Sequence, residues 1–166
     1  MQNIKKKINV LFVCMGNICR SPAAEAILKS RSQQSSSLNL YVESCGMGSW
    51  HVGHSADSRM KEACESRGIF LTGVAQQFNQ EFLDRFDYLL AADEEVLQHL
   101  YRYARTPEEK LKICLMTKYS PLYAEKDVPD PYYGGSNGFE VVIDMLEDSC
   151  KGLIDRIQSE HPDLTF

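Results

Sequence analysis

Two residues with the potential for phosphate chemistry, Cys14 and Arg20, flank a stretch of five residues near the start of the chain. A cysteine thiolate is a strong nucleophile, and a guanidinium group offers a planar fork of donors that matches two phosphate oxygens. The C-x5-R spacing is weak by itself, because six cysteines in 166 residues make chance matches common. The residues before Cys14 and after Arg20 therefore decide whether this spacing indicates a phosphate site.

That surrounding sequence has the pattern of a strand, a short loop and a helix. Residues 8–14 form an apolar run that predicts a buried strand ending at Cys14. Gly16 and Asn17 break the run, and Ser21-Pro22 predicts a helix with Ser21 as its N-cap. Such a loop directs backbone N–H groups and a helix N-terminus at one point, which makes an anion site. We expect this field, and the Ser21 hydroxyl, to stabilise a thiolate at Cys14.

A candidate acid lies far downstream, in the segment Asp130-Pro131-Tyr132-Tyr133. When a thiolate accepts a phosphoryl group, the departing oxygen must be protonated, and a water must later be deprotonated. An aspartate before proline is usually only a turn residue. Together with the Cys14 loop, however, Asp130 is interpreted as the general acid and base.

The remaining pattern predicts alternating strands and helices. The predicted strands are 8–14, 40–43, 86–91 and 111–115, and the predicted helices are 23–29, 57–67, 93–104 and 139–157. This alternation predicts a single-domain α/β fold, a four-stranded parallel sheet with helices on both faces and the site at the carboxyl ends of its strands. We expect the domain to span residues 8–160, between a flexible arm at 1–7 and a tail at 161–166.

Composition narrows the class of protein. A net charge of −5 argues against a nucleic-acid partner, and the basic run at 5–7 is interpreted as a solvated arm. No stretch approaches a membrane span, and the N-terminus lacks an export signal. The cysteines show no C-x-x-C pairs, so neither zinc nor a disulfide framework is expected. We therefore expect a reduced, cytoplasmic protein.

The segments Val13–Pro22 and Asp130–Gly134 resemble those of the low-molecular-weight protein tyrosine phosphatases. The resemblance runs from about Val10 to the last predicted helix. It implies a flavodoxin-like fold, a phosphocysteine intermediate on Cys14, and neither a metal nor an organic cofactor. It also implies that the phosphate is bound by Arg20 and by a loop made of Met15, Gly16, Asn17, Ile18, Cys19 and Ser21.

The same resemblance assigns supporting roles around the loop. Asn17 is expected to hold the loop in a strained shape with help from Ser44, and Asp93 is expected to orient Arg20. One departure stands out, because Gly73 occupies a position where many relatives carry a histidine that supports this network. Either the support is looser here, or another group such as His51 or His54 replaces it.

Aromatic residues suggest the substrate. Trp50, Tyr132 and Tyr133 could enclose an aromatic ring, and a deep slot favours phosphotyrosine over the shorter phosphoserine. Related arginine phosphatases tend to carry threonine in place of Ile18, and related arsenate reductases need two further resolving cysteines. A catalytically silent phosphate-binding module would be expected to lack Cys14 or Asp130. These three alternatives are therefore less favoured.

Two further expectations concern partners and redox chemistry. The expected partner is a protein that carries phosphotyrosine, and the expected state is a monomer or weak dimer. Cys19 lies in the same tight loop as Cys14. We hypothesise that a reversible disulfide between them shields Cys14 from over-oxidation.

Overall fold

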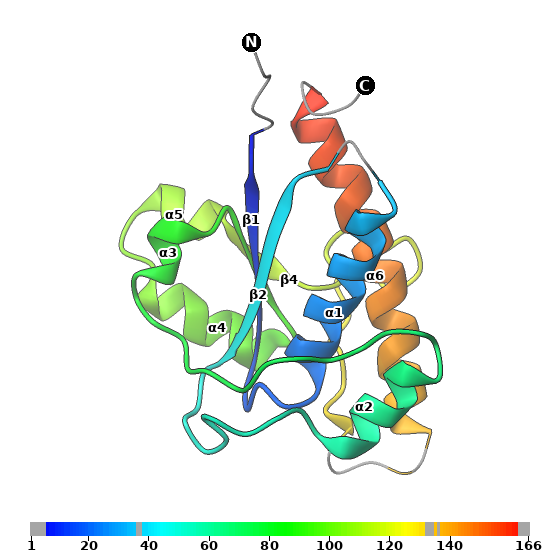
Figure 1. Ribbon diagram of the computed structural model, residues 1–166. Coiled ribbons are helices and arrows are strands. Elements are labelled where there is room, and N and C mark those ends of the chain that lie inside the picture. The colour runs from blue at the N-terminus through cyan, green and yellow to red at the C-terminus, as the bar shows by residue number, and fades with distance from the viewer. Residues whose placement is uncertain (1–5, 36–37, 132–134, 136, 163–166) are drawn as a thin grey trace.

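Four parallel strands form one sheet in the computed structural model, which describes residues 6–35, 38–131, 135 and 137–162. The strands are β1 (Ile8–Cys14), β2 (Leu40–Gly46), β3 (Tyr88–Ala91) and β4 (Ile113–Leu115), in the spatial order β2-β1-β3-β4 (Figure 1). The predicted fold class is therefore confirmed. Because β1 lies inside the sheet, Cys14 pairs with Gly46 of β2 on one side and lies one residue beyond the last pair with β3 on the other.

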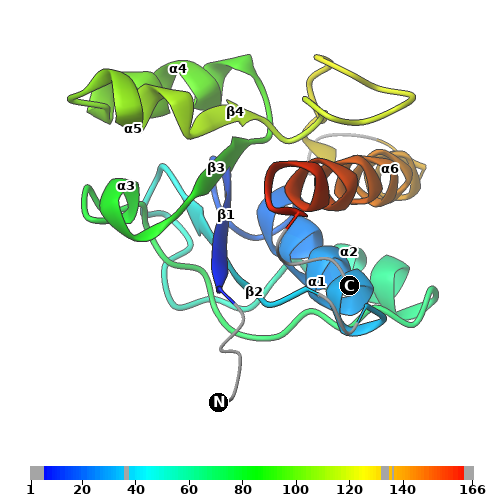
Figure 2. The same ribbon diagram turned by 90° about the horizontal axis from the view of Figure 1, so that it is seen from above.

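Helices cover both faces of the sheet (Figure 2). On one face lie α1 (Arg20–Gln33), α2 (Ser58–Glu65) and α6 (Gly138–Glu160), and on the other lie α3 (Phe82–Arg85), α4 (Glu94–Tyr103) and α5 (Pro107–Leu111). Alternate side chains of β1 point to opposite faces. Val10 and Phe12 join the core beneath α1 and α6, whereas Leu11 and Val13 join the core beneath α3 and α4.

Element boundaries differ from the sequence-based predictions, and helix α1 is longer at both ends than the predicted 23–29. Strand β2 continues to Gly46 because the chain pairs with β1 along its whole length. Strand β3 begins at Tyr88 because Phe86 closes the unpredicted helix α3. Residue Leu111, predicted as strand, ends α5, a helix capped by the Thr106 side chain with proline in its first turn. Among the described helices, none is both long and apolar enough to cross a membrane.

Candidate active site

The predicted nucleophile, Cys14, ends β1 beneath the N-terminus of α1 and is 2% exposed. Its sulfur accepts a hydrogen bond from the backbone N–H of Asn17 at 3.2 Å and lies 2.9 Å from the Ser21 hydroxyl. Donors of this kind stabilise a negative sulfur more than a neutral one. The sulfur therefore has one backbone donor and one hydroxyl contact, and a stabilised thiolate at Cys14 stays a prediction.

The predicted N-cap role of Ser21 is wrong. Helix α1 begins two residues earlier than that cap implies, at Arg20, with Cys19 in the cap position and no side-chain cap. The Ser21 hydroxyl turns inward instead, where it accepts a hydrogen bond from Asn17 Nδ2 at 2.7 Å and lies against the Cys14 sulfur. Ser21 therefore contacts the Cys14 sulfur, as predicted, but it does not cap helix α1.

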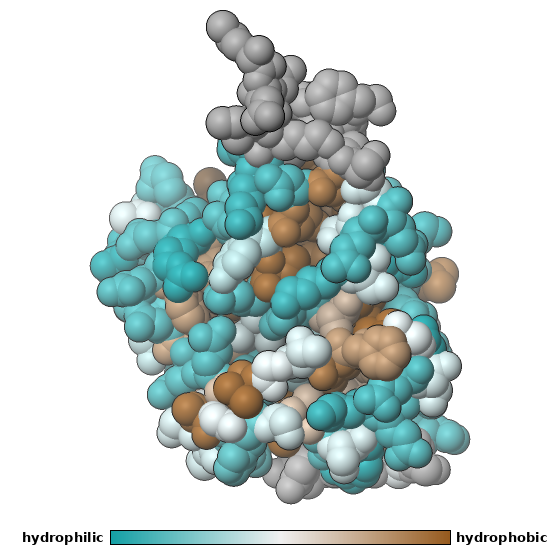
Figure 3. All heavy atoms as spheres, in the orientation of Figure 1, coloured by the Kyte–Doolittle hydropathy of each residue, from teal (hydrophilic) through white to brown (hydrophobic). Residues whose placement is uncertain are grey.

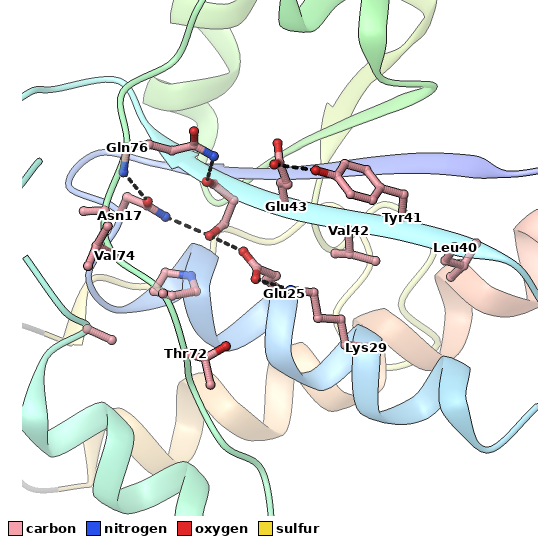
Figure 4. Close-up of a pocket in the computed structure, with 15 residues that line it drawn as sticks. Asn17, Glu25, Lys29, Leu40, Tyr41, Val42, Glu43, Thr72, Val74 and Gln76 are labelled. Carbon is pink, nitrogen blue, oxygen red and sulfur yellow. Dashed lines mark hydrogen bonds and ion pairs between the residues drawn. The ribbon is translucent and has the colours of Figure 1, made fainter. Parts of the chain in front are cut away.

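Asn17 stabilises the loop between β1 and α1 through hydrogen bonds of its side chain. Its backbone has a φ of 58°, in the left-handed region that asparagine tolerates better than most residues. Its Nδ2 donates to the hydroxyls of Ser21 and Ser44, and its Oδ1 accepts from the backbone N–H of Gln76 at 3.0 Å (Figure 4). Ser44 donates in turn to Glu25 Oε1 at 2.8 Å. The contacts with Ser44 agree with the predicted support, whereas Gln76 and Glu25 were not predicted.

Arg20 is a buried cation with fixed partners. It is 3% exposed, and its Nη1 donates to Asp93 Oδ2 at 2.6 Å and to the Val128 carbonyl at 3.1 Å. Its Nη2 lies 3.8 Å from Asp130 Oδ2. Burial acts to lower the pKa of Arg20, but Cys14 and Asp93 outweigh this effect, so its pKa lies above the ordinary value. Arg20 is therefore charged and oriented before any ligand arrives.

Cys14 and Arg20 line one pocket of about 330 Å³. Its lining consists of Cys14, Met15, Gly16, Ile18, Cys19, Arg20, Trp50, His51 and Asp130. The pocket therefore brings together the predicted nucleophile, the predicted phosphate ligand and the predicted acid, from the ends of β1 and α1 and from the loop after β4. His51 was predicted only as a possible support for the loop, and not as a lining residue of this pocket.

Trp50 lies at the mouth of the pocket and is 68% exposed. Its ring rests on Gly48, where an added Cβ would lie 1.8 Å from the indole, so any side chain there would displace the ring. Tyr132 and Tyr133, the other predicted walls, lie outside the described residues.

At Gly73 the backbone has a φ of 83°, and an added Cβ would meet no atom within 4 Å. The network beneath the loop is completed by Glu25 and Gln76. His51 instead packs over Gly16, and His54 tilts against His51 at a ring distance of 6.1 Å.

Within the described part of the chain, no cluster of three histidine, cysteine or acidic side chains could hold a metal ion.

A parallel α/β sheet with a cysteine at the end of a central strand, bonded by the Asn17 N–H and next to a buried arginine, defines a class of cysteine-based phosphate-binding sites. Comparisons with known proteins specify the class further. The sequence profile of the low molecular weight phosphotyrosine protein phosphatases matches residues 9–163. A low molecular weight protein-tyrosine-phosphatase of Streptomyces coelicolor is 40% identical, over 91% of this chain and 94% of its own length.

Solved structures of phosphatases are also similar to this chain. A protein tyrosine phosphatase from Entamoeba histolytica superposes with a TM-score of 0.86 at 37% identity, over 92% of this chain and 98% of that one. A Drosophila arginine phosphatase superposes with a TM-score of 0.81 at 31% identity, over 90% and 97%. The chain belongs to the low molecular weight phosphotyrosine protein phosphatase family.

Proposed function

We propose that this protein hydrolyses phosphotyrosine in protein substrates, with Cys14 as nucleophile, Arg20 as phosphate ligand and Asp130 as general acid and base. The observation that supports this most directly is the shared pocket, which Cys14, Arg20 and Asp130 all line. Family membership supports the same reaction.

The geometry suggests the order of events. The Cys14 thiolate attacks phosphorus while loop N–H groups and Arg20 bind the nonbridging oxygens. The bond from phosphorus to the tyrosyl oxygen breaks, and Asp130 transfers its proton to that oxygen. Asp130 then removes a proton from a water that attacks the phosphocysteine, which releases inorganic phosphate and the free thiolate.

The substrate preference rests on the mouth of the pocket. Trp50 offers an exposed aromatic face there, and such faces stack on aromatic rings. Similarity to an arginine phosphatase makes phosphoarginine the second candidate. A panel of peptides carrying phosphotyrosine, phosphoserine or phosphoarginine separates these possibilities, and equal or better turnover of phosphoarginine would overturn the preference for phosphotyrosine. Within the cell, we propose a cytoplasmic location.

The nucleophile is tested by Cys14→Ser. We expect hydrolysis of para-nitrophenyl phosphate to fall by at least about a thousandfold, because a serine hydroxyl is a much weaker nucleophile than a cysteine thiolate. Cys114→Ser, which changes a thiol in β4, is the matched control and should keep normal activity. Comparable activity in the two variants would remove Cys14 from the mechanism.

Asp130→Ala tests the acid by its dependence on the leaving group. We expect turnover of phenyl phosphate to fall by about 10²- to 10⁴-fold, and that of para-nitrophenyl phosphate to fall less, because nitrophenolate leaves without full protonation. Phosphate affinity should persist. Asp127→Ala, which changes an exposed carboxylate of the same loop, is the control. An equal loss with both substrates would contradict the acid role.

A further inference from the structure

His51 lines the active-site pocket, and the proposed mechanism leaves it without a role. Of the described residues that line this pocket, only Arg20 and His51 can carry a positive charge. Arg20 is already paired with Asp93 and bonded to the Val128 carbonyl, and the mechanism directs its guanidinium to phosphate. His51 is therefore the cationic group of this lining that is left for another part of the substrate.

The loop that carries His51 is fixed to the loop between β1 and α1. Before His51, the Gly48 N–H donates to the Met15 carbonyl at 2.9 Å, and after it the His54 N–H donates to the His51 carbonyl at 2.8 Å. The imidazole packs over Gly16, where an added Cβ would lie 3.0 Å from His51 Cδ2. The absence of a side chain at Gly16 thus lets the imidazole lie close to the backbone, and its position is set before a substrate arrives.

The His51 ring also has hydrogen-bonding capacity that the protein does not use. Neither ring nitrogen makes a hydrogen bond or an ion pair with any residue that the structure describes, and the ring contact is with His54 at 6.1 Å. The side chain is half-buried, so a ligand can reach it. A neutral imidazole has one N–H donor and a protonated imidazole has two.

The charges around His51 leave room for an anion. Besides His54, the titratable groups that share its pocket are Cys14, Cys19, Arg20 and Asp130. Asp130 is the one carboxylate among the described lining residues, and its Oδ2 lies 3.8 Å from Arg20 Nη2, so these two charges oppose each other. Asp130 is also protonated, and so neutral, when it acts as the acid.

His51 directly follows Trp50, which lies at the mouth of the pocket. In Figure 3, hydrophobic and hydrophilic atoms lie side by side at the lower left of the molecule, where the chain leaves β2 in Figure 1. A tyrosyl ring that stacks on Trp50 places the neighbouring residues of its peptide at this mouth. The mouth thus offers an aromatic face to the ring and an imidazole to a neighbouring side chain.

We propose that His51 is a specificity-determining residue, which binds the carboxylate of an aspartate or glutamate next to phosphotyrosine in the substrate. This role presupposes the proposed hydrolysis of phosphotyrosine and narrows the substrate class to acidic phosphotyrosine peptides. A protonated imidazole donates a charge-assisted hydrogen bond to the carboxylate. Because an imidazole changes charge between pH 5 and 8, the preference for acidic peptides is larger at pH 6 than at pH 8.

The test compares kcat/KM for matched peptides that carry glutamate or glutamine beside phosphotyrosine. One pair is acetyl-Glu-phosphotyrosyl-Ala-amide and its Gln counterpart, and the other is acetyl-Ala-phosphotyrosyl-Glu-amide and its Gln counterpart. We expect the glutamate peptide of at least one pair to be preferred about fivefold at pH 6 and less than about twofold at pH 8, mainly through KM. The phosphate group is common to both peptides of a pair, so its own titration cancels in the ratio.

Two substitutions of His51 separate charge from hydrogen bonding. His51→Gln keeps a polar side chain without a charge and should remove the preference at pH 6. His51→Lys supplies a cation that stays charged at pH 8, so it should show the preference at both pH values. His54→Gln is the matched control, and its ratios should equal those of the wild-type protein at each pH.

Each result bears on a different statement. Equal kcat/KM within both pairs at pH 6, an unchanged ratio in His51→Gln, or a ratio that disappears in His54→Gln would overturn the role of His51 and leave phosphotyrosine hydrolysis standing. No turnover of any of the four peptides would overturn that hydrolysis, and the role of His51 with it. The wild-type ratios at the two pH values test the proposal even where a His51 variant does not fold.

Discussion

Arg20 shows how a single residue can be made ready for a ligand by its partners. Its charge is almost wholly buried, and buried charges are tolerated only when they are paired and hydrogen-bonded. Asp93 supplies both requirements, because Oδ2 pairs with Arg20 while Oδ1 accepts from the N–H of Val96 and caps α4. The same side chain therefore fixes an element and orients a functional group.

This double role gives a graded prediction for Asp93. We expect Asp93→Ala to lower the free energy of unfolding by about 3–5 kcal/mol, since it removes the carboxylate nearest to a buried cation and also removes a helix cap. Asp93→Asn keeps a capping oxygen and should cost about 1 kcal/mol less. Urea unfolding followed by circular dichroism measures both, and equal losses would show that the cap contributes nothing.

A second residue-scale prediction concerns Cys19. Burial, followed by the charge of Asp57, raises its pKa to about 12, so Cys19 is a thiol at neutral pH. After peroxide converts Cys14 to a sulfenic acid, attack by the Cys19 thiolate would form the disulfide and release hydroxide. The thiolate fraction grows about tenfold per pH unit below the pKa, so this protection should increase with pH.

The measurement is the activity recovered by dithiothreitol after peroxide treatment at pH 7 and pH 9. We expect the recovered fraction to be higher in the wild-type protein than in Cys19→Ala, with the difference larger at pH 9. Equal recovery in both proteins at both pH values would exclude the shielding disulfide.

Some residues of the site could be predicted from the sequence and others could not, and the reason is physical. Cys14, Arg20 and Asp130 carry chemistry in their side chains, so their types and spacing were informative. Val128 and Gln76 contribute a carbonyl and an N–H to the site, and every residue has those groups. Only the path of the folded chain reveals such contacts.

At the scale of elements, α6 is the longest helix described, and it packs against α1 and α2. Arg67, just after α2, reaches three carboxylates along α6, from Glu140, Asp144 and Glu147. The apolar spacing of α6 predicted its existence and its buried face. The ion pairs could not be predicted, because they depend on where α2 ends relative to α6.

Helix α6 also contains an unfavourable buried group. Ser149 is 3% exposed, and its hydroxyl has no hydrogen-bond partner among the described residues. We expect Ser149→Ala to raise the free energy of unfolding by about 1 kcal/mol, because it removes an unsatisfied polar atom and adds the best helix former. Ser120→Ala is the contrasting control, since Ser120 bonds to Asp148 and Tyr123, and it should destabilise. Thermal unfolding compares the two, and a destabilised Ser149→Ala would contradict this account.

At the scale of the whole molecule, alternation of strands and helices predicted a parallel sheet with the site at its carboxyl edge. It did not predict the strand order, which places β1 and β3 side by side and so brings Asp93 to Arg20. The short helices α3 and α5 were missed because four or five residues cannot show a helical period. The position of α5 follows from its Thr106 cap and its contacts with β4, and that of α3 from the burial of Phe82 and Leu83. The expected monomer or weak dimer stays a prediction, which sedimentation equilibrium measures.

The placement of Trp50 on Gly48, at the mouth of the pocket, has a practical consequence. Trp50 is the single tryptophan of the sequence, so the intrinsic fluorescence excited at long wavelength comes from this one indole. The ring is largely exposed, and a ligand in the pocket would lie next to it. The protein thus carries its own optical reporter, and its emission should report occupancy of the active site in real time without any added label.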